Sequence, residues 1–569
     1  ILFSSQFEQP RQDPSAITLS RGGQDDETIG SDDDTFSRLF LSNQVRSKDG
    51  KTSPNNTSQK TTMMEMDDGK EVNRNTNSSD DSLDDDERRT KILTALKNLD
   101  EEIQGDIVLM SNKTKFLVAA QVWQSSVRPP LAVVEASSTN DVSIALPILA
   151  GLQRDYNIPF RVRSGGYTYM TDYSNIPDGI VLSLTRMNNL SFGNLTRSEK
   201  EVSGSRLADT IATTNTTLKF QPGVSAEQFM QEVLYKHGYV GIVPSAADVG
   251  MGGFVLGGGY GLQSRLYGLA IDNVVSAEAV LMNGTQVVVE NGDDLFWGLL
   301  GSGGANFAVV TDIEQRVYPS NDVKLCASTK LSLEELSGFL QRLGDLESDL
   351  APEFTLTVSG YYPPDNRTSP DISSLNFSSI GRGLDRNKNY DGDDDIGFVD
   401  LKMYWTGEDN PTSQIGLNYI ETKIALLLNQ TAPESKIVYY YFSWSAMSRE
   451  KEQDSLWKSV WSAQSWNGFL MPRNNTKVVW DDIVSSFEAM FRYCDYATPS
   501  ISLWGGTVSK RVPSETAFPY RSALYNVGVE LLVPDGTKQH THINPRDQIH
   551  LINAIWPSID RHLTGVYVN

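Results

Sequence analysis

The sequence predicts an α+β fold in two parts that follow a disordered acidic tail. Three observations support this prediction. A polar, acidic composition ends near residue 90, a strand–helix–strand pattern begins at residue 131, and aromatic residues become more frequent after residue 320. With 569 residues the chain is long enough for two or three domains.

The first segment, residues 1–90, has too few apolar side chains to offset the conformational entropy that folding removes. We therefore expect a disordered tail, with an ion-binding acidic tail as the alternative. Apolar residues then recur at helical spacing, at Ile92, Leu93, Leu96 and Leu99. This spacing predicts a helical lead-in over residues 91–126.

Residues 127–319 begin with a predicted β-α-β unit. Leu131–Val134 is a buried-strand run, Thr139–Asp141 opens an amphipathic helix, and Pro159–Arg163 is the next strand. A loop at the carboxyl end of such a strand often binds a ligand. Residues 320–500 predict a second domain that covers the first, with a helix over 331–348 and a Gly/Asp-rich loop at 381–396.

The charge restricts the partners that we expect. A net charge of −23 and a pI near 4.7 oppose binding to nucleic acid or to an anionic membrane surface. The sequence contains no apolar run long enough for a transmembrane helix. Cys326 and Cys494 can form one disulfide or none, and they cannot form a thiolate metal cluster. We expect a monomer that binds a small-molecule substrate.

The sequence contains more N-glycosylation sequons than the composition predicts, since about five would be expected by chance. They lie at Asn55, Asn56, Asn77, Asn112, Asn189, Asn194, Asn215, Asn283, Asn366, Asn376, Asn429 and Asn474. The excess predicts a secreted glycoprotein, and a general Asn/Thr-rich composition is the alternative. Because the chain starts at Ile1 and residues 1–30 lack a signal pattern, a signal peptide is expected to be missing or removed.

Three glycine clusters indicate a binding site. They are Arg163–Tyr169, Gly250–Gly261 and Gly301–Phe307. Glycines allow backbone N–H groups to turn toward a ligand, and consecutive N–H groups form a nest that suits a pyrophosphate. The alternative is a set of purely structural turns. Val255 stands where a G-x-G-x-x-G motif needs its third glycine, and no P-loop motif occurs.

These clusters and their flanks resemble the FAD-binding domain of the p-cresol methylhydroxylase/vanillyl-alcohol oxidase superfamily, and most closely its berberine-bridge-enzyme-like and oligosaccharide-oxidase group. The matching segments are Val162–Gly166, Val249–Gly261, Tyr267–Val274, Asp294–Trp297, Asn306–Thr311, Trp504–Gly506, Thr516–Arg521 and Gly565–Asn569. The resemblance implies a two-part FAD domain, an antiparallel sheet that roofs the flavin, and a segment at 501–569 that returns to the FAD domain. It also implies hydride transfer from an alcohol or amine carbon to flavin N5.

The resemblance assigns FAD contacts to residues of the first two clusters, to a later strand and to the end of the chain. They are Arg163, Ser164, Gly165, Gly166, Tyr167, Thr168, Gly250, Gly252, Gly253, Gly257, Gly258, Gly259, Val309, Tyr567 and Asn569. Tyr404 and Tyr567 are the candidate catalytic residues, because a general base must reach the substrate hydroxyl. Asn569 is an alternative, and Trp466–Phe469 resembles a substrate-side aromatic segment.

Two departures from the family predict a flavin held without a covalent bond. Tyr167 and Ala246 stand where many relatives carry the histidine and cysteine that tether FAD. Phe254 stands where relatives often place a histidine near the flavin C2 carbonyl, so a donor to reduced flavin is absent. The departures suit a milder dehydrogenase. The alternative is a secreted non-catalytic binding or wall-associated protein that retains the fold.

Three further expectations concern the ends of the chain, two histidines and Glu278. The chain stops at Asn569, before a Tyr-rich segment of the family, so we expect a fragment truncated at both ends. His540 and His542 are expected in an exposed loop, because no third metal ligand follows at a suitable spacing. Glu278 is expected on a polar strand face rather than in catalysis.

Overall fold

The computed structural model describes most of the chain beyond residue 84. The described residues are 85–125, 127–169, 173–194, 214, 216–304, 306–320, 323–360, 398–408, 412–432, 436–443, 460–494, 496–534 and 545–567. The predicted tail up to residue 84, the loop at 381–396, the pair His540 and His542, and Asn569 lie outside them. All described residues belong to one compact unit, Val72–Asn569.

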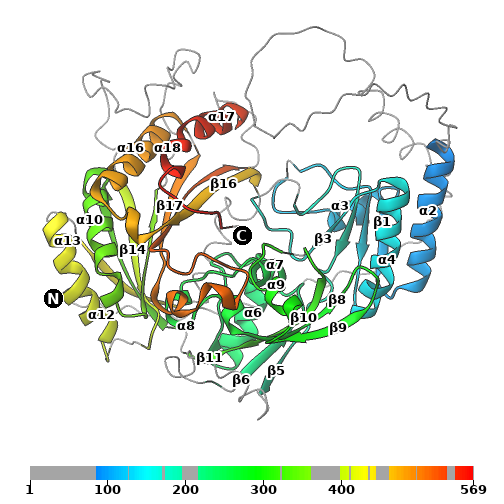
Figure 1. Ribbon diagram of the computed structural model, residues 1–569, viewed down its shortest axis with the longest axis horizontal. Coiled ribbons are helices and arrows are strands. Elements are labelled where there is room, and N and C mark those ends of the chain that lie inside the picture. The colour runs from blue at the N-terminus through cyan, green and yellow to red at the C-terminus, as the bar shows by residue number, and fades with distance from the viewer. Residues whose placement is uncertain are drawn as a thin grey trace, which may run out of the picture. The chain divides into compact units, whose positions relative to one another are not determined.

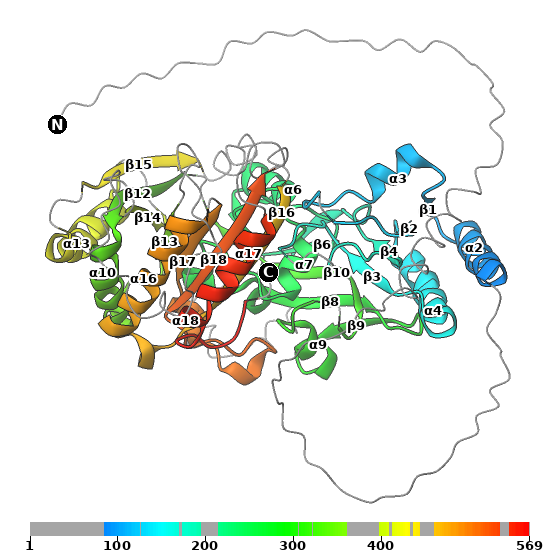
Figure 2. The same ribbon diagram turned by 90° about the horizontal axis from the view of Figure 1, so that it is seen from above.

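The lead-in predicted as helical over residues 91–126 contains two helices and, between them, the strand β1 (Asp106–Leu109), which the prediction missed. Helix α2 (Asp85–Glu102) contacts α4 (Thr139–Tyr156), and the two run side by side in both views (Figures 1 and 2). The assignment of Asp85–Glu87 to the tail was wrong, because these residues form the first turn of α2. Acidic side chains are stabilised there by the partial positive charge of a helix N-terminus. A shorter helix, α3 (Lys113–Ala119), follows.

The predicted β-α-β unit forms part of a four-stranded sheet. Its strand order is β1 (Asp106–Leu109), β2 (Ala132–Glu135), β4 (Ile180–Ser183) and β3 (Phe160–Arg163). Strands β2 and β3 both pair with β4 in parallel, and β1 is antiparallel to β2. The strand that follows the unit in the chain is therefore inserted between the two strands of the unit. Helix α4 begins after Ser138, whose hydroxyl accepts a hydrogen bond from Asp141 N.

A five-stranded antiparallel sheet completes this half of the molecule. Its order is β5 (Leu190–Asn194), β6 (Thr216–Phe220), β10 (Val309–Arg316), β8 (Val274–Val280) and β9 (Gln286–Glu290). Glu278 on β8 lies 2.5 Å from Lys219 on β6 and is partly exposed, which confirms the expected polar strand face. The separate strands β7 (Tyr239–Val240) and β11 (Tyr318–Pro319) pair with each other.

Short helices occupy the segments between these strands. They are α6 (Ala226–Met230), a π-helix (Gln231–Lys236), α7 (Met251–Leu256), α8 (Ser264–Tyr267), a 3₁₀-helix (Ala270–Asn273) and α9 (Asp294–Leu299). Their apolar side chains and those of the five-stranded sheet share one buried cluster. This cluster is the core on which the glycine clusters rest.

The second half is built on a seven-stranded antiparallel sheet, called the roof sheet below. Its order is β15 (Val438–Ser443), β12 (Val323–Ser332), β14 (Phe398–Trp405), β13 (Phe354–Ser359), β17 (Ala497–Leu503), β18 (Tyr525–Pro534) and β16 (Val460–Leu470). The antiparallel second domain that the resemblance implied is therefore confirmed, and with it the α+β class.

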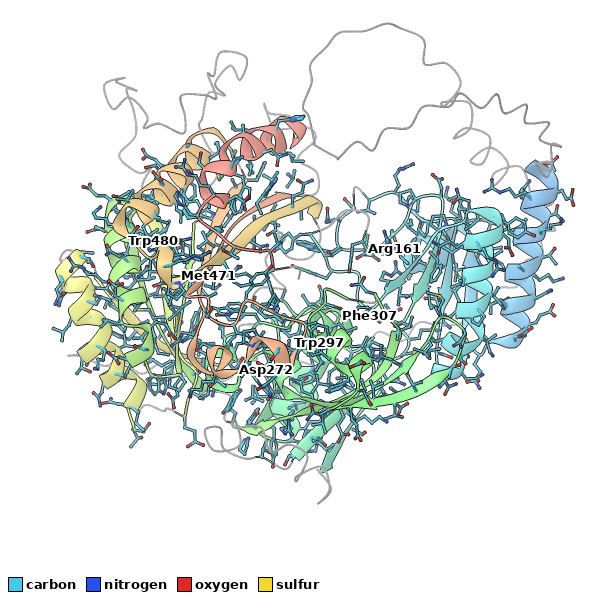
Figure 3. All side chains as sticks on the ribbon, viewed as in Figure 1. Arg161, Asp272, Trp297, Phe307, Met471 and Trp480 are labelled. Carbon is cyan, nitrogen blue, oxygen red and sulfur yellow. The ribbon has the colours of Figure 1, made fainter. Side chains whose placement is uncertain are left out.

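Helices cover one face of the roof sheet (Figure 1). They are α10 (Leu333–Asp345), a 3₁₀-helix (Glu347–Asp349), α12 (Ile415–Tyr419), a π-helix (Ile420–Ile424), α13 (Ala425–Thr431), a 3₁₀-helix (Pro472–Asn474), α16 (Lys477–Tyr493), α17 (Pro545–Ile555) and α18 (Pro557–Asp560). Helix α10 is the helix predicted over 331–348, and it starts at a capping box formed by Ser332 and Glu335. Trp480 of α16, labelled in Figure 3, is fully buried in this layer.

The side chains on the opposite face of the roof sheet pack against the first half of the molecule. Cys326, Tyr404 and Phe469 join the buried cluster of the five-stranded sheet, whereas their chain neighbours Met403 and Leu470 join the helix-covered core. This division follows from the two-residue period of a strand. Both cysteines are buried and free, so they form no disulfide. Among the helices of the described chain, none is both long and apolar enough to cross a membrane.

The segment from 504 to 524 leaves the roof sheet and returns to the first half. It contains two 3₁₀-helices, Gly506–Lys510 and Pro513–Glu515. Arg521 Nη1 lies 2.8 Å from Asp272 Oδ2, and both side chains are buried. Asp272 is labelled in Figure 3.

Candidate functional site

The first two glycine clusters are in direct backbone contact. A Cβ atom added to Gly165 would lie 2.6 Å from Gly250 N, and one added to Gly250 would lie 2.4 Å from Gly165 N. The loop after β3 (residues 163–169, the first glycine loop) and the loop that opens α7 (residues 250–261, the second glycine loop) therefore touch at a point where only glycine fits.

A common carbonyl fixes both loops in place. The hydroxyl of Ser164 donates to Pro222 O, and Gly252 N donates to the same oxygen over 3.2 Å. Met251 N donates to Val224 O over 2.8 Å. The turn after β6 therefore holds the first glycine loop and the start of α7 together, although the three segments are far apart in the sequence.

Open space lies beside Gly253. This glycine is exposed, and a Cβ atom built on it would have nothing within 4 Å. Farther along the second glycine loop, Gly259 has φ 74°, and its added Cβ would lie 2.3 Å from the side chain of Ala270. Gly259 thus serves a tight backbone turn, whereas Gly253 leaves a backbone surface that a ligand can approach.

The third glycine cluster packs against the end of α7. Gly301 N donates to Leu256 O over 3.0 Å, and Gly257, which ends α7, donates from its N to Gly253 O over 3.1 Å. Gly258 lies close to the rings of Phe518 and Tyr567, at 3.4 Å from its added Cβ. The three clusters of the sequence therefore converge around α7.

Arg163 braces the first glycine loop from within. Its guanidinium is buried, and it donates to Ala119 O, to Asn175 Oδ1 at 2.9 Å and to Ser183 Oγ at 3.4 Å. Burial lowers the pKa of Arg163 to about 10. Its side chain is engaged with the protein, and its carbonyl oxygen accepts from Leu184 N at 2.8 Å, so Arg163 supports the loop from within.

Tyr167 and Thr168 face the roof sheet. The Tyr167 ring stacks on Trp123 with ring centroids 4.1 Å apart, and Thr168 O accepts a hydrogen bond from Gln124 Nε2 at 2.7 Å. Among the described residues, the buried Tyr167 hydroxyl has no hydrogen-bond partner. Burial raises the pKa of Tyr167 well above that of free tyrosine, so its hydroxyl remains a donor at neutral pH.

Tyr567 links the end of the chain to the second glycine loop. Its hydroxyl oxygen accepts a hydrogen bond from Tyr260 N at 2.7 Å. The side chain of Asn467 on β16 binds both backbone groups of Tyr567, accepting from N at 2.8 Å and donating to O at 3.1 Å. Tyr567 therefore lies between the roof sheet and the second glycine loop.

Tyr404 lies on the roof sheet with its side chain turned toward the first half. It is buried beside Cys326, its cross-strand partner, and its ring meets Phe442 edge-on with centroids 6.1 Å apart. Burial raises the pKa of Tyr404 above that of free tyrosine. Its hydroxyl is therefore protonated at neutral pH and can serve as a hydrogen-bond donor more readily than as a phenolate base.

Two other predicted residues are structural neighbours of the loops. Val309 begins β10 and pairs with Val280, and Phe254 is buried on α7. The segment Trp466–Phe469 divides between the two faces of the sheet. The ring of Phe469 lies in the cluster shared with the first half. The ring of Trp466 packs with the helix-covered core of the roof sheet, and its indole N–H donates to Asn553 Oδ1 at 2.8 Å. The strand period places its neighbour Asn467 on the other face.

Sequence reasoning missed the residues that join the loops to the roof sheet. Arg265 on α8 is fully buried and donates to Phe354 O at 2.8 Å, to Glu347 Oε1 at 2.8 Å and to Trp504 O. At the other end of the site, Trp123 and Gln124 contact the first glycine loop. No motif marks these positions, because their partners lie tens to hundreds of residues away in the chain.

The arrangement fits a long anionic nucleotide better than a metal ion. Within the described part of the chain, no group of three or more His, Cys, Asp or Glu side chains could hold a metal. Two loops meet at side-chain-free backbone, one glycine leaves open space, and a buried tyrosine hydroxyl has no hydrogen-bond partner among the residues that the structure describes. Side-chain-free backbone of this kind suits a pyrophosphate.

Comparison with known proteins identifies this region. Residues 130–290 match the family model described as an FAD binding domain. The chain is 30% identical over 230 residues to FAD-dependent monooxygenase drtC of Aspergillus calidoustus, covering 40% of each chain. It is 29% identical over 207 residues to reticuline oxidase of Papaver somniferum, covering 35% of each. It is 26% identical over 276 residues to (R)-6-hydroxynicotine oxidase of Paenarthrobacter nicotinovorans, covering 48% of this chain and 54% of that one.

Solved structures share the fold over a larger part of the chain. A xylooligosaccharide oxidase from Myceliophthora thermophila superposes with a TM-score of 0.62 at 16% identity, covering 83% of this chain and 88% of that one. A berberine-bridge-enzyme-like protein of Physcomitrella patens gives 0.60 at 16% identity, covering 82% and 89%. In sequence, the chain spans 40% of the first curated relative it matches.

Proposed function

We propose that this chain, which belongs to the p-cresol methylhydroxylase/vanillyl-alcohol oxidase superfamily through its FAD-binding domain, is an FAD-dependent oxidoreductase whose flavin is held without a covalent bond. The observation that carries the proposal is the contact between the two glycine loops at Gly165 and Gly250. This contact presents two stretches of side-chain-free backbone next to the open space at Gly253.

The protein's own groups would hold the cofactor through backbone donors and burial. Backbone N–H groups of the first glycine loop and of Gly253 suit the pyrophosphate, because Gly252 N and Gly257 N already donate to carbonyl oxygens. Tyr167 lies on the first glycine loop, and Tyr567 contacts the second. None of the five histidines lies in the first glycine loop, and neither cysteine lies near the second. Histidyl and cysteinyl bonds to the flavin at those loops are therefore chemically impossible.

The substrate would lie between the second glycine loop and the roof sheet. Bound FAD would supply the redox chemistry, accepting a hydride from an alcohol carbon of a sugar or another secondary metabolite. By strand period and register, the sheet face turned toward the first half carries polar side chains, among them Thr355, Lys402, Asn467, Ser500, Ser502 and Asn526. Such side chains can donate to and accept from several substrate hydroxyls. Tyr404 would donate a hydrogen bond from its protonated hydroxyl.

Gly253→Ala tests the placement of the cofactor. Gly253 lies inside α7 and its added Cβ meets no atom, so alanine should stabilise the FAD-free protein by up to ~1 kcal/mol through helix propensity. If FAD passes over this backbone, the same methyl group should weaken FAD binding by about tenfold or more, which costs ~1.4 kcal/mol. FAD affinity and urea unfolding of the FAD-free protein measure the two effects.

A matched control lies in the roof half. Gly338 is inside α10, and the nearest atom to its added Cβ is 3.9 Å away. Gly338→Ala should give the same gain in stability and leave FAD affinity unchanged. Equal FAD affinity for Gly253→Ala and the native protein would contradict the proposed cofactor position.

The alternative function is a binding or wall-associated protein without turnover. It is favoured by the buried Phe254, which offers no hydrogen bond to reduced flavin. Protein that is yellow after native purification, releases the colour on acid precipitation and bleaches with an alcohol substrate would support the enzyme. Colourless protein that FAD cannot reconstitute would refute it.

We also propose that the protein enters the secretory pathway and carries N-linked glycans. Four sequon asparagines of the described chain, Asn112, Asn189, Asn283 and Asn429, are exposed. Asn474 is less suitable, because its amide donates to His562 O at 2.7 Å. Enzymatic removal of N-glycans from the protein secreted by its natural host should lower its apparent mass, and an unchanged mass would contradict this proposal.

A further inference from the structure

Gln124 joins the first glycine loop to the roof sheet through one side chain. Its Nε2 donates to Thr168 O at 2.7 Å, and its Oε1 accepts from Ala463 N at 3.0 Å. Only 2% of Gln124 is exposed, so both hydrogen bonds are shielded from water. A single amide group thus ties the loop to strand β16.

The strand that Gln124 contacts is an edge of the roof sheet. β16 pairs with β18 on one side and ends the strand order on the other. Edge strands present N–H groups that no neighbouring strand accepts. Gln124 supplies the acceptor for the N–H of Ala463, so the contact closes the sheet edge toward the first glycine loop.

Trp123 makes the same connection with its ring. Its backbone N donates to Gly166 O at 3.2 Å, and its indole stacks on Tyr167 and meets Tyr169 edge-on at 5.2 Å. The other neighbours of this small apolar cluster are Ala463 and Leu532, cross-strand partners on β16 and β18. Trp123 is therefore wedged between the loop and the sheet.

The loop held by these two residues is the first glycine loop, whose backbone would hold FAD under the proposed function. Tyr167 of this loop is part of the contact with Trp123. Loosening the loop from the sheet should ease the departure of FAD bound against the loop. The strength of this contact should therefore influence the rate of release.

We propose that Trp123 and Gln124 are positioning residues that lock the first glycine loop against the roof sheet and thereby slow the dissociation of FAD. We call these two residues the latch. The inference rests on the proposed function, because it requires FAD to be bound reversibly. The new element of the inference is that two residues outside every glycine cluster determine how long FAD remains bound.

The experiment compares Gln124→Met with Gln121→Met in the full chain. Methionine has a similar size and makes neither amide hydrogen bond, whereas the side chain of Gln121 is exposed. FAD release is followed by the recovery of flavin fluorescence after dilution. Gln124→Met should release FAD about tenfold faster than the native protein, because both buried hydrogen bonds of the amide are lost. Gln121→Met should match the native rate.

A purely structural role would give a different result. It would lower the thermal midpoint of the FAD-free and FAD-bound forms equally and leave the release rate unchanged, which would overturn the latch. Gln124→Leu is a second variant: it also removes both amide hydrogen bonds and introduces no charge, so its release rate should match that of Gln124→Met.

A measurement on the native protein does not depend on any variant folding. Addition of FAD should slow hydrogen exchange at the amide of Ala463, because the bound cofactor holds the loop against β16. Unchanged exchange there, with FAD demonstrably and reversibly bound, would overturn the latch alone. Native protein that binds no FAD, or that keeps it after acid precipitation, would overturn the proposed function and the latch together.

Discussion

Two of the contacts that join the glycine-loop half to the roof half differ in chemistry. At one, Arg265 is fully buried and bridges Glu347 and the carbonyls of Phe354 and Trp504, and Gly506 N donates to the same Glu347 oxygen at 2.8 Å. We call this the charged joint. At the other, the latch uses a neutral amide and an aromatic stack.

The difference indicates which contact is permanent and which can open. Separating the charged joint would leave an unpaired guanidinium and carboxylate in a poorly hydrated place, which is costly. Separating the latch exposes a neutral amide and rings that water can solvate at a smaller cost. The charged joint should therefore act as the fixed side of the site and the latch as the side that opens for the cofactor.

The largest effect is expected from Arg265→Met. This change removes three sets of hydrogen bonds and leaves Glu347 with Gly506 N, so the free energy of unfolding should fall by ~3–5 kcal/mol. Urea unfolding measures the change. Because the charged joint lies on the side that does not open, the FAD release rate of the folded variant should change less than that of Gln124→Met.

Two further variants control this prediction. Lys219→Met breaks an ion pair whose side chains are 45% and 37% exposed, and should cost at most ~1 kcal/mol. Adding Glu347→Gln to Arg265→Met should recover part of the lost stability by removing the unpaired charge. A loss for Arg265→Met as small as that for Lys219→Met would remove the distinction between the two contacts.

The sequence predicted the elements that follow local rules. The β-α-β unit was visible in the strand of residues 131–134 and the helix after Ser138, because buried strands and capped helices have short-range signatures. The glycine loops were predicted for the same reason, since their composition reflects the local backbone. Asp85–Glu87 were missed because acidic residues suit both a disordered tail and the first turn of a helix.

The latch and the charged joint could not be predicted, because the residues that form each contact are distant in the chain. Gln124 and Ala463 are 339 positions apart, and Arg265 and Trp504 are 239 apart. A glutamine or an arginine in an amphipathic segment gives no sign of such a partner. The aromatic segment Trp466–Phe469 could be identified in the sequence, but not which of its rings faces the first half, because the register of β16 is set by its pairing with β18.

Tyr567→Phe tests a contact that joins both sides of the site. The variant removes the oxygen that accepts from Tyr260 N, and leaves the clamp by Asn467 on the backbone. The free energy of unfolding should fall by ~1–2 kcal/mol because a partly buried N–H loses its partner. Tyr520→Phe is the control, since its hydroxyl makes no hydrogen bond among the described residues and its ring stacks on Phe469.

If the two variants unfold at the same urea concentration, the hydroxyl of Tyr567 does not anchor the second glycine loop. The placement of Tyr567 at the flavin edge would then depend on Asn467 alone, and Asn467→Ala would be the variant to compare for FAD release.

The smallest effect on stability is expected from Tyr167→Phe, and it separates the two roles of the latch. The phenylalanine ring can keep the stack on Trp123, so the FAD release rate should stay within about twofold of the native value if stacking holds the loop. The native hydroxyl is buried without a partner among the described residues, so its removal should leave the FAD-free protein equally stable or more stable by up to ~1 kcal/mol. Thermal unfolding without FAD and fluorescence-monitored FAD release measure the two quantities. A release rate as fast as that of Gln124→Met would show that the hydroxyl itself binds the cofactor, and that the stack with Trp123 contributes little to holding it.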